Sequence, residues 1–175
     1  MTLPVLLLAA LATAPGGCRA ARREQPMVVT AYCACGECNG YTRGHWWLLH
    51  LDFWNRRVAA GPKKGHPYTG RTASGGRLRE AHPGLLSIDS VVRPYMIPVR
   101  LAFFPWLFLP SDGTLAADTA YYPFGTRIYV PGYGWGVVRD RGSAIQGPEK
   151  LDIFVNGHGR ANHWGRQRLI VEVEE

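Results

Sequence analysis

The sequence predicts a mainly β protein, folded as a closed barrel of short strands with one small helix. The 175-residue chain holds 21 glycines and 13 prolines, which favours short strands and turns over long helices. From residue 113 onward, short apolar segments alternate with turn signals, as expected for strands that close into a barrel. The length is sufficient for one domain with its own core.

The amino-terminal half predicts few regular elements. In chain order they are a first strand, a Cys-rich loop and a turn, at Met27–Tyr32, Cys33–Gly40 and Thr72–Gly76. Two irregular insertions are expected, at about 41–71 and 84–110. The first includes His45–Trp54, which predicts a short helix or a partly buried loop. The second is apolar, but Pro98, Pro105 and Pro110 preclude a regular helix.

The carboxy-terminal part predicts five further strands joined by turns. These strands are Leu115–Ala117, Arg127–Val130, Trp135–Arg139, Leu151–Val155 and Arg168–Val173. Pro131–Gly134 predicts a hairpin turn, and Gly157–Trp164 a short helix.

The first 18 residues are typical of a secretory signal. The apolar run Leu3–Ala14 is followed by small residues and then by arginines, and it is short for a membrane span. Cys18 follows two glycines, so lipidation of Cys18 is the alternative to an ordinary cleaved signal or an N-terminal anchor. We therefore expect an exported protein of the periplasm or cell envelope, with an outer-membrane lipoprotein as one form of membrane association.

The formal net charge of +7 favours anionic polymers or membrane surfaces as partners. Cell-wall glycans fit this charge. The arginines and lysines are scattered and match no nucleic-acid-binding motif, so we expect no nucleic acid partner.

Three aspartates stand in apolar, strand-like settings: Asp118, Asp140 and Asp152. Aspartate is disfavoured within strands, and a half-buried carboxylate costs stability unless it is paired or hydrogen-bonded. Their recurrence predicts a site where carboxylates converge for general acid–base chemistry. The alternative is that they accept backbone N–H groups in loops and do no chemistry, which suits Asp118 best.

The segment from Gly113 to Val173 resembles the three-Asp (3D) domain of bacterial cell-wall proteins. The resemblance rests on motifs that keep the family's order and spacing. They are Gly113–Asp118, Pro123–Thr126, Asp140–Gly147, Leu151–Phe154 and Asn162–Arg166. It implies a six-stranded double-psi β-barrel over 27–175, interrupted by the two insertions, and kinship with lytic transglycosylases built on that barrel. It also implies that Asp152 is the acid–base residue, with Asp140 beside it.

The function expected from this resemblance is a peptidoglycan lytic transglycosylase. Such an enzyme cleaves the MurNAc–GlcNAc β-1,4 bond without water and leaves 1,6-anhydro-MurNAc ends. It needs one carboxyl with a raised pKa, and Leu151, Ile153 and Phe154 would desolvate Asp152. The alternatives are a non-catalytic glycan-binding barrel and a peptidoglycan glycoside hydrolase. We expect no cofactor and a monomer.

Seven further residues are candidates for contact with the glycan strand: Thr72, Ser74, Tyr133, Trp135, Gly142, Ala144 and His158. Aromatic rings would serve as platforms for sugar rings. Turn chemistry explains Thr72 and Ser74 equally well, and a surface or capping role would explain His158.

The cysteines Cys33, Cys35 and Cys38 lie in one Cys-x-Cys-x-x-Cys loop. A disulfide is the simpler expectation for an exported protein. A zinc site completed by His45 or His50 and free thiols are the alternatives.

Overall fold

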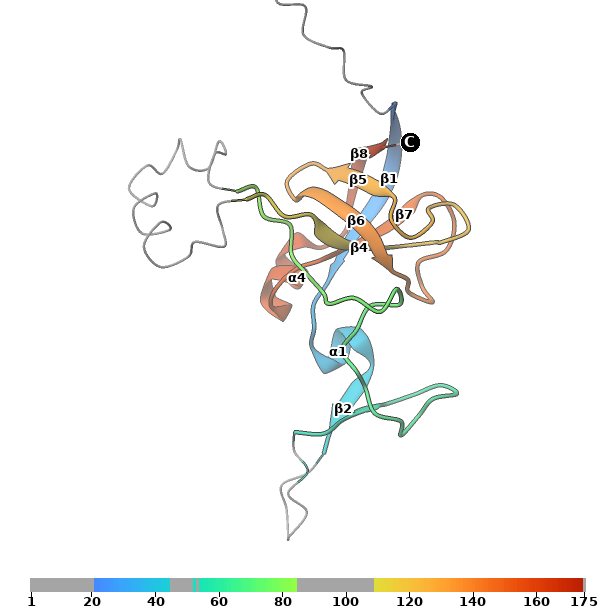
Figure 1. Cartoon of the computed structure of the whole chain (residues 1–175), viewed down its shortest axis with the longest axis vertical. Helices are drawn as coiled ribbons and strands as arrows, with labels where there is room; N and C mark the ends of the chain where they lie inside the picture. The colour runs from blue at the N-terminus through green and yellow to red at the C-terminus, as the bar shows by residue number, and fades with distance from the viewer. Residues whose placement is uncertain (1–20, 45–51, 53, 85–108, 175) are drawn as a thin grey trace, which may run out of the picture.

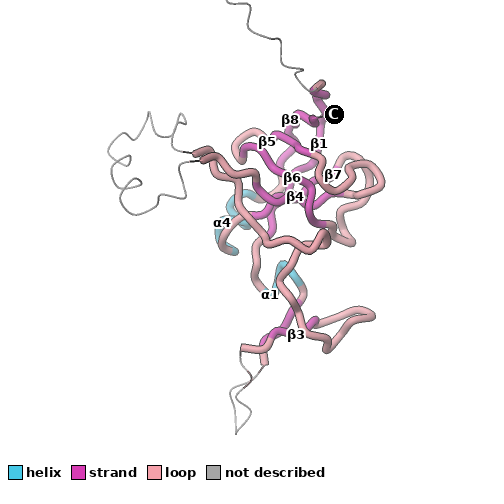
Figure 2. The backbone as a smooth tube through the Cα atoms, viewed as in Figure 1, coloured by secondary structure: helices cyan, strands magenta, loops and turns pink. Residues whose placement is uncertain are grey.

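The structure is a computed structural model, and it describes residues 21–44, 52, 54–84 and 109–174. Strands dominate it (Figures 1 and 2). The strands are β1 (Arg22–Tyr32), β2 (Tyr41–Arg43), β3 (Arg56–Val58), β4 (Gly113–Ala117), β5 (Arg127–Val130), β6 (Gly134–Asp140), β7 (Lys150–Phe154) and β8 (Gln167–Glu174). The helices described are α1 (Gly36–Asn39) and α4 (His158–Trp164).

Six of these strands close into a barrel in the order β1-β7-β4-β6-β5-β8. The pairs β1–β7 and β4–β6 are parallel, and the other neighbours are antiparallel. This confirms the predicted mainly β, six-stranded double-psi barrel. Closure leaves the barrel no free sheet edge.

The barrel is filled by alternate residues of its strands. Val29, Leu115 and Ile153 are fully buried in one core cluster, as the period of two of a strand requires. A second, smaller cluster of Tyr32, Ala116 and Phe154 lies on the outer face of the same strands. Both faces of the β1-β7-β4 region are therefore covered.

Gly136 of β6 lies against the buried side chain of Leu115. A Cβ at Gly136 would stand 2.6 Å from Leu115 Cγ, closer than non-bonded carbon atoms allow. The glycine therefore lets β4 and β6 pair in parallel with Leu115 pointing into the core.

The predicted strands are confirmed, with shifted ends. β1 begins at Arg22 rather than at Met27, because its first residues pair with β8, where Arg22 contacts Glu172 at 3.2 Å. These polar residues carry no strand pattern of their own. The Cys-rich loop contains the one-turn helix α1, and α4 begins one residue after the predicted start, with Gly157 as its N-cap.

The first insertion contains the two-stranded sheet β2–β3, which lies below the barrel in Figure 1. Most of the predicted segment His45–Trp54, the apolar part of the second insertion, the predicted signal and Cys18 lie outside the described residues. No helix among the described residues has the length and apolarity to span a membrane.

Replacing Gly136 by alanine should destabilise the fold by about 1–3 kcal/mol, since the added methyl overpacks a core that has no room. Gly159→Ala is the matched control, because a Cβ there meets no atom within 4 Å. In helix α4 that change should stabilise by about 0.5–1 kcal/mol. Urea unfolding of both variants measures the difference, and equal stabilities would contradict the packing described.

Candidate functional site

Asp140 and Asp152 flank one residue of the central strand β4. Ala116 pairs with Asp152 of β7 on one side and with Asp140 of β6 on the other. Asp152 pairs in turn with Thr30 of β1. Residues opposite one another in a sheet share a face, so these four positions form a row across four strands, on the outside of the barrel. We call it the carboxylate row.

A β-bulge places Asp140 in this row. Leu115 pairs with Val138, but the next residue, Ala116, pairs with Asp140, so Arg139 is the extra residue in β6. Without the bulge, Arg139 would stand opposite Ala116 and Asp140 would turn toward the core. Bulges re-aim side chains in this way near functional sites.

Asp152 is a partly buried carboxyl between buried neighbours in β7. Burial raises the pKa of Asp152 to about 6; a hydrogen bond from Thr30 Oγ1, at 3.0 Å, opposes the rise, and the charge of Asp140 adds to it. A carboxyl with this pKa exchanges its proton near neutral pH, as a general acid–base residue must.

Asp140 is held as a hydrogen-bond acceptor from three directions. Its Oδ2 accepts the hydroxyl of Tyr32 at 3.2 Å, and its Oδ1 accepts the backbone N–H groups of Ala73 at 3.0 Å and Arg141 at 2.9 Å. Burial and the charge of Asp140 raise the pKa of Tyr32, so Tyr32 remains a donor. The three donors together fix the orientation of the Asp140 carboxylate.

The turn predicted at Thr72–Gly76 positions one of these donors. Thr72 is buried, its hydroxyl accepts the Gly76 N–H at 3.0 Å, and it lies 3.1 Å from Ser74 Oγ. Ser74 N–H bonds the carbonyl of the bulged Arg139 at 3.0 Å. Thr72 and Ser74 thus hold the turn against the bulge, so that Ala73 N–H faces Asp140.

Two hollows of the surface meet at Asp152. One, of about 530 Å³, also contains Asp140 and is lined by parts of the Cys-rich loop, by Tyr68 and Arg71, and by Arg141, Gly142 and Ser143. The other, of about 570 Å³, is lined by Thr30, Ala144, Ile145, Lys150, Arg166 and Arg168. Both fall in the size range of ligand sites. Five basic side chains make this cleft attractive to an anionic ligand.

The predicted residues Gly142 and Ala144 lie one in each hollow. Asp118, by contrast, is a loop anchor that lines neither. Its Oδ1 accepts Ala120 N–H at 3.0 Å and its Oδ2 accepts Gly147 N–H at 2.9 Å. These bonds lower the pKa of Asp118 and fix the end of the loop that carries Gly142 and Ala144.

The other predicted contact residues lie away from the carboxylate row. The Tyr133 hydroxyl donates to the carbonyl of Phe154 at 2.8 Å and accepts Ala81 N–H at 3.3 Å. Trp135 packs at 5.5 Å from the Tyr129 ring and between Arg22 and Arg127. The structure therefore gives both rings structural contacts.

His158 lies with the cysteines rather than with the aspartates. Its Nδ1 is 3.4–3.9 Å from the sulfur atoms of Cys33, Cys35 and Cys38. The alternative histidines His45 and His50 lie outside the described residues.

The cleft residues not predicted from the sequence include Thr30, Tyr32, Tyr68 and Arg71. Thr30 and Tyr32 end the first strand on the face opposite the core residue Val29. Their alternation with Val29 was the available signal, but the partner strand was unknown. No pattern marks Tyr68 and Arg71, which reach the cleft through an irregular segment.

Asp152→Asn should make the protein more stable at alkaline pH. The folded pKa of Asp152, about 6, lies above the unfolded value of about 3.9. The wild type thus loses stability as pH rises through about 6, and the variant, which keeps the acceptor for Thr30, does not. We expect a gain of about 2–3 kcal/mol at pH 8 that disappears near pH 4, measured by denaturant unfolding.

Asp118→Asn is the control, because its effect on stability at alkaline pH should have the opposite sign. The lowered pKa of Asp118 contributes stability above its unfolded pKa, which is lost as pH falls. This variant should be less stable than wild type at pH 8, with the difference shrinking in acid. The same pH dependence for both variants would contradict the environments described.

Comparison with known proteins shows what the region that carries Asp140 and Asp152 resembles. Residues 113–174 match the family model of the 3D domain. The "Cell wall-binding protein YocH" of Bacillus subtilis (strain 168) is 38% identical over 64 residues, which are 37% of this chain and 22% of that protein. YabE of the same strain is 33% identical over 64 residues, 37% of this chain and 16% of that protein. The chain thus spans less than a quarter of either relative.

Among solved structures, the crystal structure of MltA from E. coli is 23% identical, with a TM-score of 0.30, and the match covers 39% of this chain and 26% of that chain. The family model covers the strands that carry Asp140 and Asp152 and the loop that begins at Asp118. Residues 113–174 of this chain are therefore similar to the 3D domain.

Proposed function

We propose that this protein is a peptidoglycan lytic transglycosylase of the cell envelope, in which Asp152 acts as the general acid and then as the general base. The observation that carries the proposal is the carboxyl of Asp152, with a pKa raised to about 6, at the meeting point of two hollows. The 3D domain and the cell wall-binding relative YocH support peptidoglycan as the polymer bound.

The reaction needs no water and no second nucleophile from the protein. Protonated Asp152 gives its proton to the glycosidic oxygen, and the bond from that oxygen to C1 of MurNAc breaks. The 6-hydroxyl of the same MurNAc bonds to C1 and releases its proton to the Asp152 carboxylate. The products are a free 4-hydroxyl on GlcNAc and a 1,6-anhydro ring, and Asp152 is again protonated.

Asp140 has a different role, because hydrogen-bond donors hold its carboxylate in place. It accepts three hydrogen bonds and lies in the same hollow as Asp152. As an anion it helps keep Asp152 protonated and would stabilise positive charge developing on the sugar ring.

The basic walls of the cleft suit the rest of the polymer. Muramic acid and the stem peptides carry carboxylates. Arg71 and Arg141 line one hollow, and Lys150, Arg166 and Arg168 the other. We assign these side chains to positioning the glycan strand across Asp152. Because the proposed substrate lies in the cell envelope, the protein would be exported to it.

Two alternatives rest on specific observations. A non-catalytic glycan-binding barrel is favoured by the name of the relative YocH, a cell wall-binding protein. A hydrolase is favoured by the presence of two carboxyls in one hollow, because hydrolysis uses a pair about 5–9.5 Å apart. The transglycosylase remains our choice because Asp140 is occupied by hydrogen bonds and is poorly placed to activate water.

Digestion of purified peptidoglycan by the wild type should yield muropeptides lighter, by the mass of one water, than hydrolysed ones. Asp152→Asn should lower this rate about 10²–10⁴-fold while preserving binding to the polymer. Glu149→Gln, which alters an exposed carboxylate next to β7, is the matched control and should retain full activity. Mass spectrometry of the products and cosedimentation measure the two properties.

The other outcomes decide between the alternatives. Products of hydrolysed mass would establish the hydrolase. An absence of products from a wild type that still cosediments with peptidoglycan would establish the binding barrel. Equal activity of the wild type and Asp152→Asn would remove Asp152 from the chemistry.

A further inference from the structure

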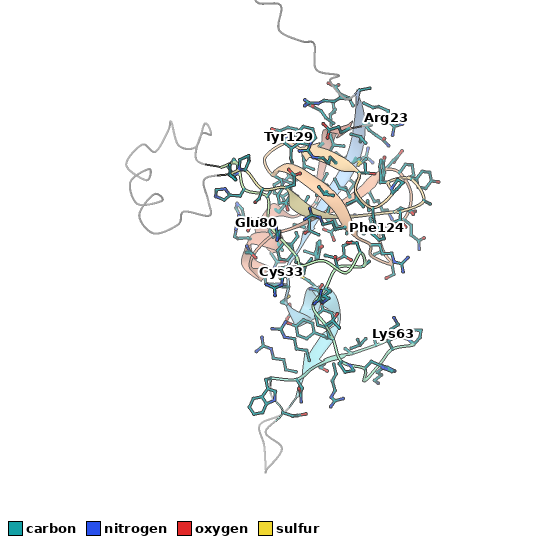
Figure 3. All side chains as sticks on the ribbon, in the orientation of Figure 1. Arg23, Cys33, Lys63, Glu80, Phe124 and Tyr129 are labelled. Atoms are coloured by element: carbon teal, nitrogen blue, oxygen red, sulfur yellow. The ribbon has the colours of Figure 1, made fainter. Side chains whose placement is uncertain are left out.

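Three sulfur atoms and one imidazole nitrogen converge where the barrel meets α1. The atoms are the Sγ of Cys33, Cys35 and Cys38 and the Nδ1 of His158, all within 4.8 Å of one another. Cys33 directly follows β1 and is buried, and Figure 3 labels it below the barrel strands. His158 opens α4, more than 100 residues later in the chain.

We propose that Cys33, Cys35, Cys38 and His158 form a structural Zn²⁺ site. Tetrahedral zinc, with bonds of about 2.3 Å to sulfur and 2.0–2.1 Å to nitrogen, places its ligand atoms about 3.6–3.8 Å apart. The sulfur atoms of Cys33 and Cys38 are 3.6 Å apart. The distances from Nδ1 to the three sulfur atoms are 3.9, 3.4 and 3.7 Å. One ion therefore fits among all four atoms.

The surroundings of the four residues are those of a metal site. The Nε2 of His158 lies 3.1 Å from the carboxylate of Glu37, which fixes the ring so that the lone pair of Nδ1 faces the sulfur atoms. Ligating histidines commonly make this second contact. The N–H of Cys38 bonds the sulfur of Cys35 at 3.4 Å, and such bonds stabilise a thiolate.

The Cys-rich loop is also held by hydrogen bonds that do not involve the sulfur atoms. The amide of Asn39 donates to the carbonyls of Cys33 and Cys35, and Tyr41 donates to the carbonyl of Ala34 at 2.9 Å. Gly40 ends the turn in the left-handed conformation, with φ of 59°. Side-chain hydrogen bonds to the loop's backbone thus help hold the three cysteines in place, as preorganised ligands should be.

A disulfide fits this geometry less well than a metal. Its sulfur atoms lie about 2.05 Å apart, whereas Cys33 and Cys38 are 3.6 Å apart. A disulfide would also use two sulfur atoms and leave the third thiol and His158 Nδ1 facing it. Three thiolates and an imidazole form a donor set that selects zinc over hard cations such as magnesium or calcium.

The metal would join the end of β1 to α4 and hold one wall of the cleft. Cys38, Asn39 and Gly40 line the hollow that contains Asp140 and Asp152, and Tyr32, which donates to Asp140, directly precedes Cys33. This site rests on its own geometry and stands whether or not the protein cleaves peptidoglycan. We expect loss of zinc to loosen the cleft wall while the barrel strands remain paired.

The full chain, purified without chelators, should contain one zinc per molecule by elemental analysis. With cobalt in place of zinc, the protein should show the intense visible bands of a tetrahedral cobalt–thiolate site. Cys38→Ser and His158→Ala should lose the stoichiometric metal. His163→Ala, on the same helix but outside the cluster, should retain it.

Glu37→Gln provides a test that does not endanger folding, because the Glu37 side chain is 81% exposed. It should weaken zinc binding about 10-fold or more, measured by competition with a chromophoric chelator. We also expect the thiols of Cys33, Cys35 and Cys38 to react fully with a thiol reagent once zinc has been removed from the wild type. A Cys33–Cys38 disulfide in protein purified without reductant, or cobalt spectra unchanged by His158→Ala, would overturn the proposal.

Discussion

The pairing of β4 with a strand on each side is the constraint on which the site depends. β4 runs parallel to β6 and antiparallel to β7, so residues far apart in the sequence meet across Ala116. A small side chain is needed there, since Ala116 is buried between Tyr32 and Phe154. The bulge at Arg139 then decides which face Asp140 occupies. A one-residue change of register would send this carboxylate into the core, among packed and mostly apolar side chains.

The two carboxyls differ through their surroundings rather than through their own chemistry. Asp152 has one hydrogen-bond donor, Thr30, and buried neighbours, so desolvation dominates and the neutral acid is favoured. Asp140 has three donors, which fix the orientation of its carboxylate. The charge of Asp140 raises the pKa of Asp152 further, because it makes ionisation of Asp152 more costly. The turn and bulge that place Asp140 in the row therefore also affect the protonation of Asp152.

Much of the barrel could be predicted from the sequence because its signals are local. Alternating apolar residues with glycine and proline turns mark the strands from β4 to β8, and Arg127–Val130 has the predicted bounds. The start of β1 could not be predicted, because Arg22 and Arg23 are strand residues only through pairing with β8. The apolar setting of Asp152 was visible in the sequence. The bulge that turns Asp140 toward it was not, since register is a property of two strands.

Prediction of the cysteine cluster from the sequence meets the same limit. The spacing of Cys33, Cys35 and Cys38 is evident in the chain, and a nearby histidine was the natural fourth ligand. The fold instead brings in His158, because α4 packs beside the end of β1. Residue spacing could not reveal a contact that depends on how the chain closes the barrel. Tyr32, which donates to Asp140, directly precedes Cys33, and residues of the loop line the hollow that contains the two aspartates, so the two sites adjoin one another.

The titration of the Asp152 carboxyl carbon by NMR tests the central claim most directly. We expect an apparent pKa of about 6 in the wild type, moving downward in Asp140→Asn as the neighbouring charge is removed. An ordinary value near 3.9 in the wild type, unaffected by the change at Asp140, would contradict it. In that case the row of carboxylates would be part of the architecture alone.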